Sequence, residues 1–424
     1  MSKFGVIVIG GGPSGLMASI AAAEQGASVV LLDKGDRLGR KLGISGGGRC
    51  NVTNIKEINE LIQYIPGGGR FLYSAFSLFS NRDIIAFFEK LGIALKEEDN
   101  GRMFPVSDKA KTVVDALVGK ARALGVKLQT HHPVQEVLFA DGKVQGVTLV
   151  SGEQIYADSV IIATGGKSVP HTGSTGDGYP WAAAAGHTIT ELYPTEVPIV
   201  SKEPYIVDRS LQGLSLRDVK LSVLNGKGKP VVQHQGDMIF THFGLSGPIA
   251  LRCSGFIRSV KQKSGSSEVK LALDLFPTMS LTELDTYLRR LMAEEPKRAL
   301  KNVLKGTIPE RLLPILFERA ALAADTTYEH LPKETWQAFV TNLKSFIIIV
   351  TGTRSFDEAF VTGGGVHLKE ISPQTMESKL MPGLFFCGEV MDIHGYTGGY
   401  NITAAFATGY TAGHHAGLLA QGLL

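Results

Sequence analysis

Four side chains suited to acid–base chemistry lie in or beside glycine-rich segments: Cys50, His242, His394 and Tyr396. Thiol, imidazole and phenol groups can each hold and transfer a proton. Each residue also has a structural interpretation, because a cysteine can pack in a core, a histidine can satisfy a local hydrogen bond and a tyrosine can cover a ligand. The four are therefore candidates for proton transfer, and their use depends on the elements that hold them.

Histidine and cysteine spacing indicates neither a metal site nor a disulfide framework. Two adjacent histidine pairs lack the spacing with which one helix presents two metal ligands, and no C-x-x-C pair is present. An odd number of distant cysteines is typical of a reducing compartment, so we expect a cytoplasmic protein. Because paired redox cysteines are missing, we do not expect a disulfide reductase. The histidine pairs are His131-His132 and His414-His415, and the cysteines are Cys50, Cys253 and Cys387.

The first 33 residues predict a site for an adenine dinucleotide. An apolar run, Val6 to Ile9, meets Gly10, Gly12 and Gly15 and continues as a helix pattern of small residues. In such a turn the first glycine permits a tight bend, the second lets the backbone approach a pyrophosphate, and the third lets helix and strand pack closely. The start of the helix supplies amide donors and the positive end of a dipole.

Asp33 narrows the choice of dinucleotide. It ends a second apolar strand, about 20 residues after the glycines, where an acid can hold ribose hydroxyls. A carboxylate at this position repels a 2′-phosphate. The sequence therefore favours FAD or NAD over NADP at this site.

Composition is that of a globular enzyme with more than one domain. The chain has 424 residues, of which 44% are apolar and 20% charged, and 50 glycines suit a fold with many backbone turns around a ligand. A net charge of +3 is too small to indicate nucleic acid or membrane binding by the whole chain. The uncharged run Phe4 to Ala23 is interrupted by Gly-Gly-Gly-Pro, so we expect no membrane span there.

Changes in local composition and predicted secondary structure along the chain indicate a domain that is interrupted by an insertion. Two prolines near residue 194 precede a region, residues 199–275, that is predicted to be mostly strand. Residues 280–345 are predicted to be helices broken by prolines, and Phe346 to Val350 predicts a buried strand that resumes the first domain. We therefore expect a dinucleotide-binding domain made of residues 1–194 and 346–424.

Later segments distinguish a flavoprotein from a nicotinamide enzyme. The chain has one complete strand, glycine turn and helix unit, whereas the other glycine groups lack the flanking strand and acid. Two further strand ends, Ala163 to Gly166 and Gly388-Glu389, are typical of a glutathione-reductase-like FAD domain.

At these residues the chain resembles the bacterial flavoprotein family that contains BaiN-like bile-acid reductases, aminoacetone oxidases and RdsA-type ribosomal RNA dihydrouridine synthases. The resemblance implies FAD as cofactor. It also implies an α/β fold, in which a glutathione-reductase-like Rossmann domain holds an inserted β-barrel (195–278) and a helical subdomain (279–345). The distinctive blocks are Gly39–Asn54, Ala163–Val169, Thr172–Gly178, Thr241–Pro248, Val361–Val366 and Phe386–Asn401.

The resemblance also assigns cofactor contacts by motif. Glu389 would bind the ribityl chain, the backbone of Val134 would meet the adenine, and the first amides of the last helix, at Asn401 and Ile402, would stabilise negative charge on a reduced flavin. Arg40-Lys41 and the loop from Ser45 to Cys50 would run beside the pyrophosphate and the flavin. The other expected contacts are Gly10, Gly12, Pro13, Ser14, Gly15, Asp33, Lys34, Arg40, Lys41, Ser45, Gly46, Gly47, Gly48, Arg49, Cys50, Asn51, Thr164, Gly165, Gly166 and Gly388.

Basic residues are concentrated in the insertion. Residues 195–345 contain 21 Lys and Arg against 16 Asp and Glu. Arg298, Lys301 and Lys305 follow i, i+3, i+7 spacing and are predicted to share one helix face, near Arg289 and Arg290. Such a stripe is either a solvated face or, as the resemblance implies, a surface for RNA phosphates.

The reaction expected is hydride transfer through FAD to an activated double bond, with NADH or NADPH visiting transiently because no second dinucleotide domain is evident. Three alternatives stay open: a large-subunit ribosomal RNA dihydrouridine synthase, a small-amine oxidase that releases hydrogen peroxide, and a non-catalytic flavin-bound RNA-binding module. The expected partners are accordingly a small-molecule substrate or ribosomal RNA, without a membrane partner. The sequence leaves the oligomeric state open.

Overall fold

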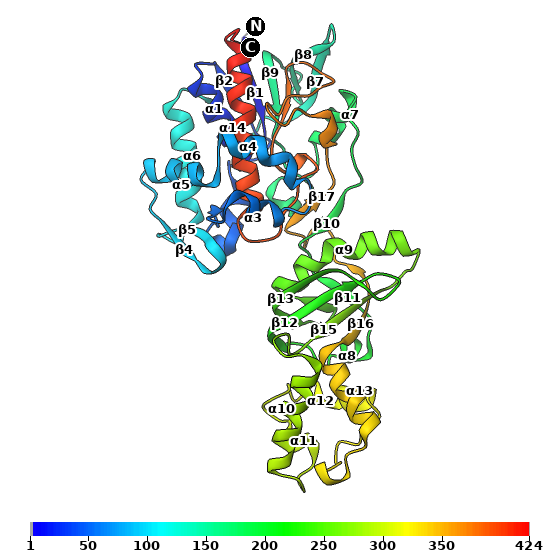
Figure 1. Ribbon diagram of the computed structural model, residues 1–424. Coiled ribbons are helices and arrows are strands. Elements are labelled where there is room, and N and C mark those ends of the chain that lie inside the picture. Colours follow the sequence, from blue (N-terminus) through cyan, green and yellow to red (C-terminus); the bar gives the residue numbers. More distant parts are fainter. Residues whose placement is uncertain (1–2, 424) are drawn as a thin grey trace. The chain divides into compact units, whose positions relative to one another are not determined.

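The computed structural model describes residues 3–423, which form two units (Figure 1). The first unit contains the chain up to Pro194 and again from Ala359, and the second contains Thr195–Glu358. Each unit has its own sheet and helices.

A mixed sheet forms the centre of the first unit, in the order β6-β2-β1-β9-β8-β7, with β18 also paired to β9. Strands β6, β2, β1, β9 and β18 are parallel, and β8 and β7 add antiparallel pairs. The inner strands are apolar because both faces of the sheet are covered. The strands are β1 (Lys3–Ile9), β2 (Val29–Leu32), β6 (Lys127–Gln129), β7 (Val134–Ala140), β8 (Lys143–Leu149), β9 (Gln154–Ile162) and β18 (Leu384–Phe386).

Helices α1 (Pro13–Glu24) and α14 (Tyr400–Ala420) lie side by side against this sheet (Figure 1). Glycines spaced four residues apart let their backbones approach closely. A Cβ atom placed on Gly413 would lie 2.1 Å from the carbonyl oxygen of Ala18, and one on Gly409 would lie 2.3 Å from that of Ser14. This contact fixes the start of α1 relative to α14.

A smaller sheet, in the order β3-β5-β4, and further helices complete the first unit. Strands β10 and β17, which pair with each other, precede and follow the insertion in the chain. These elements are α2 (Arg40–Ile44), β3 (Thr53–Asn54), α3 (Ile58–Gln63), α4 (Tyr73–Leu78), α5 (Asn81–Lys90), β4 (Leu95–Glu98), β5 (Arg102–Pro105), α6 (Ala110–Ala123), α7 (Gly178–Ala184), β10 (Tyr193–Thr195) and β17 (Val361–Gly363).

The second unit contains a closed barrel with the order β11-β14-β13-β12-β15-β16. Its strands are β11 (Ile199–Ser201), β12 (Ser215–Leu224), β13 (Pro230–Phe240), β14 (Gly244–Ser246), β15 (Val269–Asp274) and β16 (Phe346–Thr353). The barrel and the Rossmann-type sheet confirm the predicted fold class.

Within the region predicted to be mostly strand, Pro248–Ser264 is instead the 17-residue helix α9. The prediction was wrong there because the helical spacing of apolar residues within this segment was overlooked among the neighbouring strand patterns. The buried residues at that spacing are Ile249, Cys253, Ile257 and Val260.

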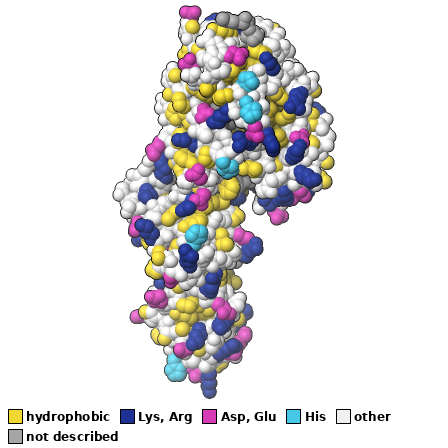
Figure 2. Space-filling model, turned by 180° about the vertical axis from the view of Figure 1, so that it is seen from behind, with side chains coloured by type: hydrophobic (Ala, Val, Ile, Leu, Met, Phe, Trp, Pro, Cys, Tyr) yellow, Lys and Arg dark blue, Asp and Glu magenta, His cyan; other side chains and the backbone are white. Residues whose placement is uncertain are grey.

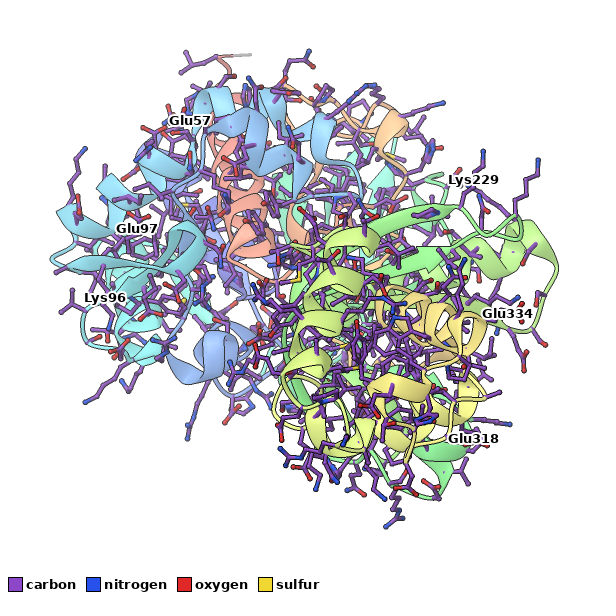
Figure 3. The ribbon with its side chains drawn as sticks, turned by 60° about the horizontal axis from the view of Figure 1, so that its bottom comes forward. Glu57, Lys96, Glu97, Lys229, Glu318 and Glu334 are labelled. Atoms are coloured by element: carbon purple, nitrogen blue, oxygen red, sulfur yellow. The ribbon has the colours of Figure 1, made fainter. Side chains whose placement is uncertain are left out.

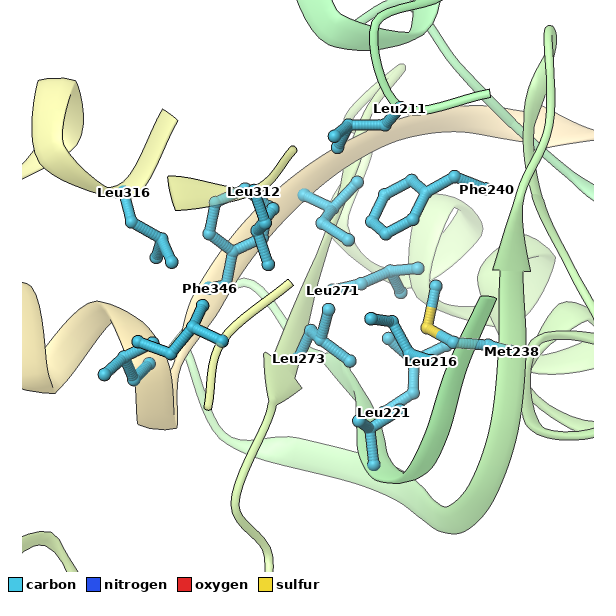
Figure 4. Close-up of a cluster of buried hydrophobic side chains, with 14 of the residues drawn as sticks. Leu211, Leu216, Leu221, Met238, Phe240, Leu271, Leu273, Leu312, Leu316 and Phe346 are labelled. Atoms are coloured by element: carbon cyan, nitrogen blue, oxygen red, sulfur yellow. The ribbon is translucent and has the colours of Figure 1, made fainter. Parts of the chain in front are cut away.

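The helical part of the insertion shares one hydrophobic core with the barrel. Leu312 and Leu316 belong to the same buried cluster as the barrel residues Phe240, Leu271 and Phe346 (Figure 4). The helices are α8 (Pro204–Val207), α10 (Leu281–Glu294), α11 (Leu300–Val303), α12 (Leu313–Arg319) and α13 (Lys333–Lys344).

The predicted return to the first domain at residue 346 is therefore wrong. Strand β16 pairs with β15 and β11 of the barrel, and the chain re-enters the first unit at Ala359. The run Phe346 to Val350 is apolar enough for any buried strand, so its sequence does not indicate which sheet it joins. Across residues 3–423, no helix combines the length and apolar character needed to span a bilayer.

Candidate dinucleotide site

The glycine turn after β1 has one open position between two closed ones. A Cβ atom on Gly10 would lie 2.5 Å from the carbonyl oxygen of Ala163, and one on Gly15 would lie 1.9 Å from that of Gly10. A Cβ atom on Gly12 would meet nothing within 4 Å. Gly12 is also the N-cap of α1, and no side chain caps it, with Pro13 following at the first helical position. The turn therefore leaves space beside a helix N-terminus, which is what a pyrophosphate needs.

Asp33 is held by the backbone of two turns. Its Oδ2 accepts a hydrogen bond from the amide of Gly11 at 2.7 Å, and its Oδ1 accepts one from the amide of Gly35 at 2.7 Å. The carboxylate is thereby fixed at the end of β2, beside the glycine turn. The neighbouring Lys34 contacts the side chains of Thr175 and Asp177 instead.

Glu389 follows β18 and reaches two distant segments. Its Oε2 lies 2.8 Å from Nζ of Lys41, and its Oε1 accepts a hydrogen bond from the amide of Thr362 at 2.7 Å. Gly388 packs on the start of α1, since a Cβ atom there would lie 2.5 Å from Oγ of Ser14. The acid predicted to bind the ribityl chain is thus paired with α2, which leads into the loop Ser45–Asn51, and it follows Gly388, which packs on the start of α1.

The end of β9 closes the same edge of the sheet. Ala163 donates its amide to the carbonyl oxygen of Ile9, and Gly166 packs on Thr362 and Glu389 so closely that a Cβ atom would lie 2.3 Å from Oγ1 of Thr362. Thr164 Oγ1 is buried without a hydrogen-bond partner, and Gly165 has a positive φ of 72°. Parallel strands place their carboxyl ends at one edge, where open α/β sheets bind ligands.

The loop Ser45–Asn51 is exposed at its glycines and anchored at its end. Gly46, Gly47 and Gly48 all have positive φ, and Cβ atoms on the last two would meet nothing within 4 Å. The anchor is Arg49: its guanidinium lies over the Phe104 ring at 4.2 Å from the centroid. Arg40, at the start of α2, donates to the carbonyl oxygen of His171 at 2.8 Å.

An ion-pair network holds Arg49 on the small sheet. Its two terminal nitrogens donate to the two oxygens of Glu98 at 2.7 and 3.1 Å, and the hydrogen bond from Arg49 lowers the pKa of that carboxyl. Lys96 lies 2.6 Å from Asp108 and lowers the pKa of that carboxyl in the same way. Figure 3 shows Lys96 on β4 of this sheet. Arg49 is therefore engaged by protein carboxylates rather than directed to a ligand.

Cys50 is fully buried at the end of this loop. Burial raises the pKa of its thiol to about 12, and its backbone has a positive φ of 62°. At neutral pH the thiol therefore keeps its proton.

His394 is paired with a tyrosine, Tyr193, from the distant strand β10. Its Nε2 lies 3.0 Å from the hydroxyl oxygen of Tyr193, and its ring packs on Gly67, where a Cβ atom would lie 2.1 Å away. Burial lowers the pKa of His394, so the imidazole is neutral at pH 7. Tyr193 is not among the predicted site residues, because no local pattern links it to a residue 201 positions later.

Tyr396 is buried and lies edge-on to the ring of Tyr64. The nearby Asn401 uses its side chain on the turn, accepting from the amide of Gly395 at 2.7 Å and donating to the carbonyl oxygen of Gly395 at 2.8 Å. Asn401 and Ile402 form part of the first turn of α14, whose N-cap Gly399 provides no side chain. The role expected for their amides stays a prediction, whereas the Asn401 side chain has a structural one.

Two other expected site residues lie apart from these contacts. Val134 begins β7 and pairs with Leu149 at the sheet edge. His242 belongs to the second unit, is exposed, and contacts the ring of Phe243. Among residues 3–423, no group of three metal-binding side chains is close enough to hold an ion.

The predicted basic stripe does not share one helix face. Helix α11 has only four residues, so Arg298 precedes it and Lys305 follows it. The three cations pair with Glu295, Asp325 and Glu310 respectively. The face in Figure 2 likewise shows blue and magenta side chains interspersed at the helical end of the second unit. The chain turns at Pro296 and α11 ends at Val303, so of the three cations only Lys301 lies on this helix.

These features define a Rossmann-type dinucleotide-binding protein with an inserted barrel. The model of the family described as HI0933-like protein Rossmann domain matches residues 4–415, and the chain belongs to that family. This finding confirms the family expected from the sequence blocks.

Two curated relatives match over nearly their whole length. The chain is 32% identical over 420 residues to the 3-dehydro-bile acid delta(4,6)-reductase of Clostridium scindens, covering 98% of this chain and 99% of the relative. It is 32% identical over 412 residues to the ribosomal RNA dihydrouridine synthase of Escherichia coli, covering 97% of each. The chain is an oxidoreductase, as predicted.

Solved structures at low identity support the fold alone. The fumarate reductase subunit FrdA of E. coli matches with a TM-score of 0.51 at 17% identity, covering 99% of this chain and 71% of that one. The 3-ketosteroid delta1-dehydrogenase of Sterolibacterium denitrificans matches with a TM-score of 0.50 at 14% identity, covering 99% and 100%.

Proposed function

We propose that the first unit binds FAD across the edge formed by the glycine turn, the end of β9 and the end of β18. This proposal rests mainly on the free space beside Gly12, where a Cβ atom would meet nothing within 4 Å, whereas Cβ atoms on Gly10 and Gly15 would collide with backbone atoms. Two buried polar atoms without hydrogen-bond partners, Oδ1 of Asn51 and Oγ1 of Thr164, occur in the neighbouring segments. Space and unsatisfied polar groups together fit an absent polar ligand.

Residues from four segments would hold this cofactor. The amides at the start of α1 would bind the pyrophosphate, Asp33 the adenosine ribose, and Glu389 the ribityl chain. Lys41 keeps Glu389 charge-balanced in a site where its side chain is only 20% exposed. A bound flavin supplies hydride chemistry that the protein side chains lack.

We further propose that the enzyme is a reductase that saturates an activated carbon–carbon double bond, with NADH or NADPH as electron donor. The support is that both full-length relatives have names that denote reduction of such a bond, in a dienone and in uridine. An adjacent carbonyl group makes these bonds accept hydride at one carbon and a proton at the other.

The protein must then hold a proton donor near the substrate. Tyr193 suits this role because its phenol is paired with neutral His394, which orients it and can donate to the oxygen when the proton leaves. Cys50 suits it less well, since a fully buried thiol with a pKa of about 12 has little access to solvent protons. Tyr193 is the proposed donor, and His394 is its positioning residue.

Anaerobic mixing of the FAD-loaded protein with NADH and then NADPH tests the reductase proposal. Bleaching of the oxidised flavin absorbance within the turnover time is the expected result. A flavin that stays oxidised with both donors but bleaches with a small amine, and releases hydrogen peroxide in air, would instead establish the oxidase.

The ribosomal RNA dihydrouridine synthase is the second candidate, because that relative matches at the same identity as the bile-acid reductase. Nucleoside analysis of large-subunit ribosomal RNA from a strain that lacks the gene distinguishes the two. Loss of one dihydrouridine establishes the RNA substrate, and unchanged RNA directs the search to small enones. A protein that binds FAD and RNA tightly without any turnover would be the non-catalytic module.

A further inference from the structure

Asn51 has a buried side-chain oxygen that the protein does not satisfy. The residue is 7% exposed, and its Oδ1 has no hydrogen-bond partner. Leaving a buried amide oxygen unpaired costs free energy, so such an atom in a folded protein calls for a ligand or water. Two other asparagines buried nearby use their side chains: Asn54 donates to the carbonyl oxygens of Asn100 and Gly398, and Asn81 donates to those of Asn54 and Lys56.

The unsatisfied oxygen lies against the N-terminus of α14. A Cβ atom on the N-cap residue Gly399 would lie 2.9 Å from Oδ1 of Asn51. The same segment is fixed there by the hydrogen bond between Thr53 and Thr403, at 2.8 Å. This helix has 21 residues and no capping side chain, so its first turn presents amide donors that the helix itself does not use.

The combination of these two features restricts the ligand. A helix N-terminus binds an acceptor or a negative charge, whereas the oxygen of Asn51 needs a donor. A simple anion such as phosphate would accept from the helix N-terminus but would leave the oxygen of Asn51 without a donor. A planar edge on which an N–H group lies beside carbonyl oxygens satisfies both.

We infer that Asn51 and the first turn of α14 together bind the pyrimidine edge of the flavin ring. The N3–H group of the ring would donate to the side-chain oxygen of Asn51. A neighbouring ring carbonyl would accept from a backbone amide in the first turn of α14. The assignment also holds if Oδ1 and Nδ2 of Asn51 are exchanged, because the ring edge offers both a donor and acceptors. The inference rests on the proposed FAD binding and adds the group that reads this edge of the ring.

Equilibrium binding of two ligands to one set of variants tests the assignment. The ligands are FAD and FAD methylated at N3, and the proteins are wild type, Asn51→Ala, Asn51→Asp and the control Asn342→Ala in helix α13 of the second unit. Wild type and the control should bind FAD about tenfold more tightly than the methylated ligand, the loss expected for one buried hydrogen bond. Asn51→Ala should bind FAD about tenfold more weakly than wild type and should not distinguish the two ligands.

A second readout does not depend on turnover. A carboxylate in place of the amide would disfavour negative charge on the reduced ring, so Asn51→Asp should lower the flavin midpoint potential relative to wild type. Because the wild-type comparison of the two ligands needs no variant, the test holds even if Asn51→Ala does not fold. Equal binding of both ligands by wild type, or an unchanged preference in Asn51→Ala, would overturn the assignment while leaving FAD binding intact. Absence of FAD binding by wild type would overturn the proposed function itself.

Discussion

Lys41 and Glu389 are 348 positions apart in the chain, yet Nζ of the lysine lies 2.8 Å from Oε2 of the glutamate. The pair connects helix α2, which leads into the loop Ser45–Asn51, with the turn after β18. Both side chains are mostly shielded from water, with 26% and 20% exposed. The pair therefore joins two of the segments proposed to surround FAD.

Removing the Glu389 carboxylate should affect FAD affinity more than it affects the stability of the fold. For Glu389→Gln we expect FAD affinity to fall roughly tenfold, because a strong acceptor for ribityl hydroxyls is lost. The free energy of unfolding of the FAD-free protein should fall by about 1 kcal/mol, as for a partly exposed ion pair. FAD titration and chemical denaturation measure the two effects, and equal FAD affinity in the variant would refute the ribityl role.

Gly413 should tolerate no side chain, because its Cβ position is 2.1 Å from the Ala18 carbonyl oxygen. We expect Gly413→Ala to lower the free energy of unfolding by about 2–3 kcal/mol through overpacking of α1 and α14. Gly119 in α6 is the matched control, since a Cβ atom there meets nothing within 4 Å. Gly119→Ala should raise stability by up to about 1 kcal/mol, because alanine is the better helix former. Similar effects at both positions in thermal unfolding would contradict the close helix contact.

Stability should decrease as the pH falls below about 6.5. Burial lowers the pKa of His187, so the unfolded chain, in which a histidine titrates near 6.5, binds the proton more readily than the folded chain. The stabilisation is thus complete above pH 6.5 and is lost as the pH falls through the lowered folded pKa.

Denaturation at pH 7.5 and 5.5 checks this sign in wild type and in His187→Gln. Burial shifts the pKa values of His234, His394 and His414 in the same direction, so the pH dependence should shrink in the variant rather than vanish. An identical pH dependence in both proteins would show that His187 contributes nothing.

Tyr193→Phe should separate the two halves of the proposed reaction. Flavin reduction by NADH or NADPH should keep its wild-type rate, since no proton from Tyr193 is needed there. Reoxidation by the substrate that wild type reduces should slow roughly a hundredfold, within the range for loss of a positioned proton donor. Stopped-flow absorbance resolves the two steps, and equal reoxidation rates would exclude Tyr193.

Cys50→Ala should retain reoxidation rates within about threefold of wild type, because the buried thiol is proposed to pack rather than to donate. Loss of substrate reduction in this variant, with flavin reduction intact, would instead support Cys50 as the proton donor.

Local sequence patterns predicted the parts of the site that a strand end defines. The glycines after β1, the acid after β2 and the Gly388-Glu389 pair after β18 each follow a short apolar run, so their position at one sheet edge could be inferred. The place of β16 could not be, because its apolar run suits either sheet and only long-range pairing chooses between them.

The contacts that complete the site also depend on distant partners. Asn51 meets Gly399, and Tyr193 meets His394, through tertiary packing that no local spacing encodes. Conversely, the basic stripe was over-interpreted, because helical spacing was assumed across a region that the structure divides into turns.

FAD titration of Gly12→Val against wild type is the most direct test of the central claim. Gly12 has an ordinary extended backbone (φ −77°, ψ −175°) and open space around its Cβ position, so valine should leave the ligand-free fold and its melting temperature nearly unchanged. The same side chain should fill the space proposed for the pyrophosphate. We predict saturable, one-to-one FAD binding by wild type and its loss in Gly12→Val. A wild-type protein that binds no FAD, or a folded Gly12→Val variant that binds it equally well, would contradict the account.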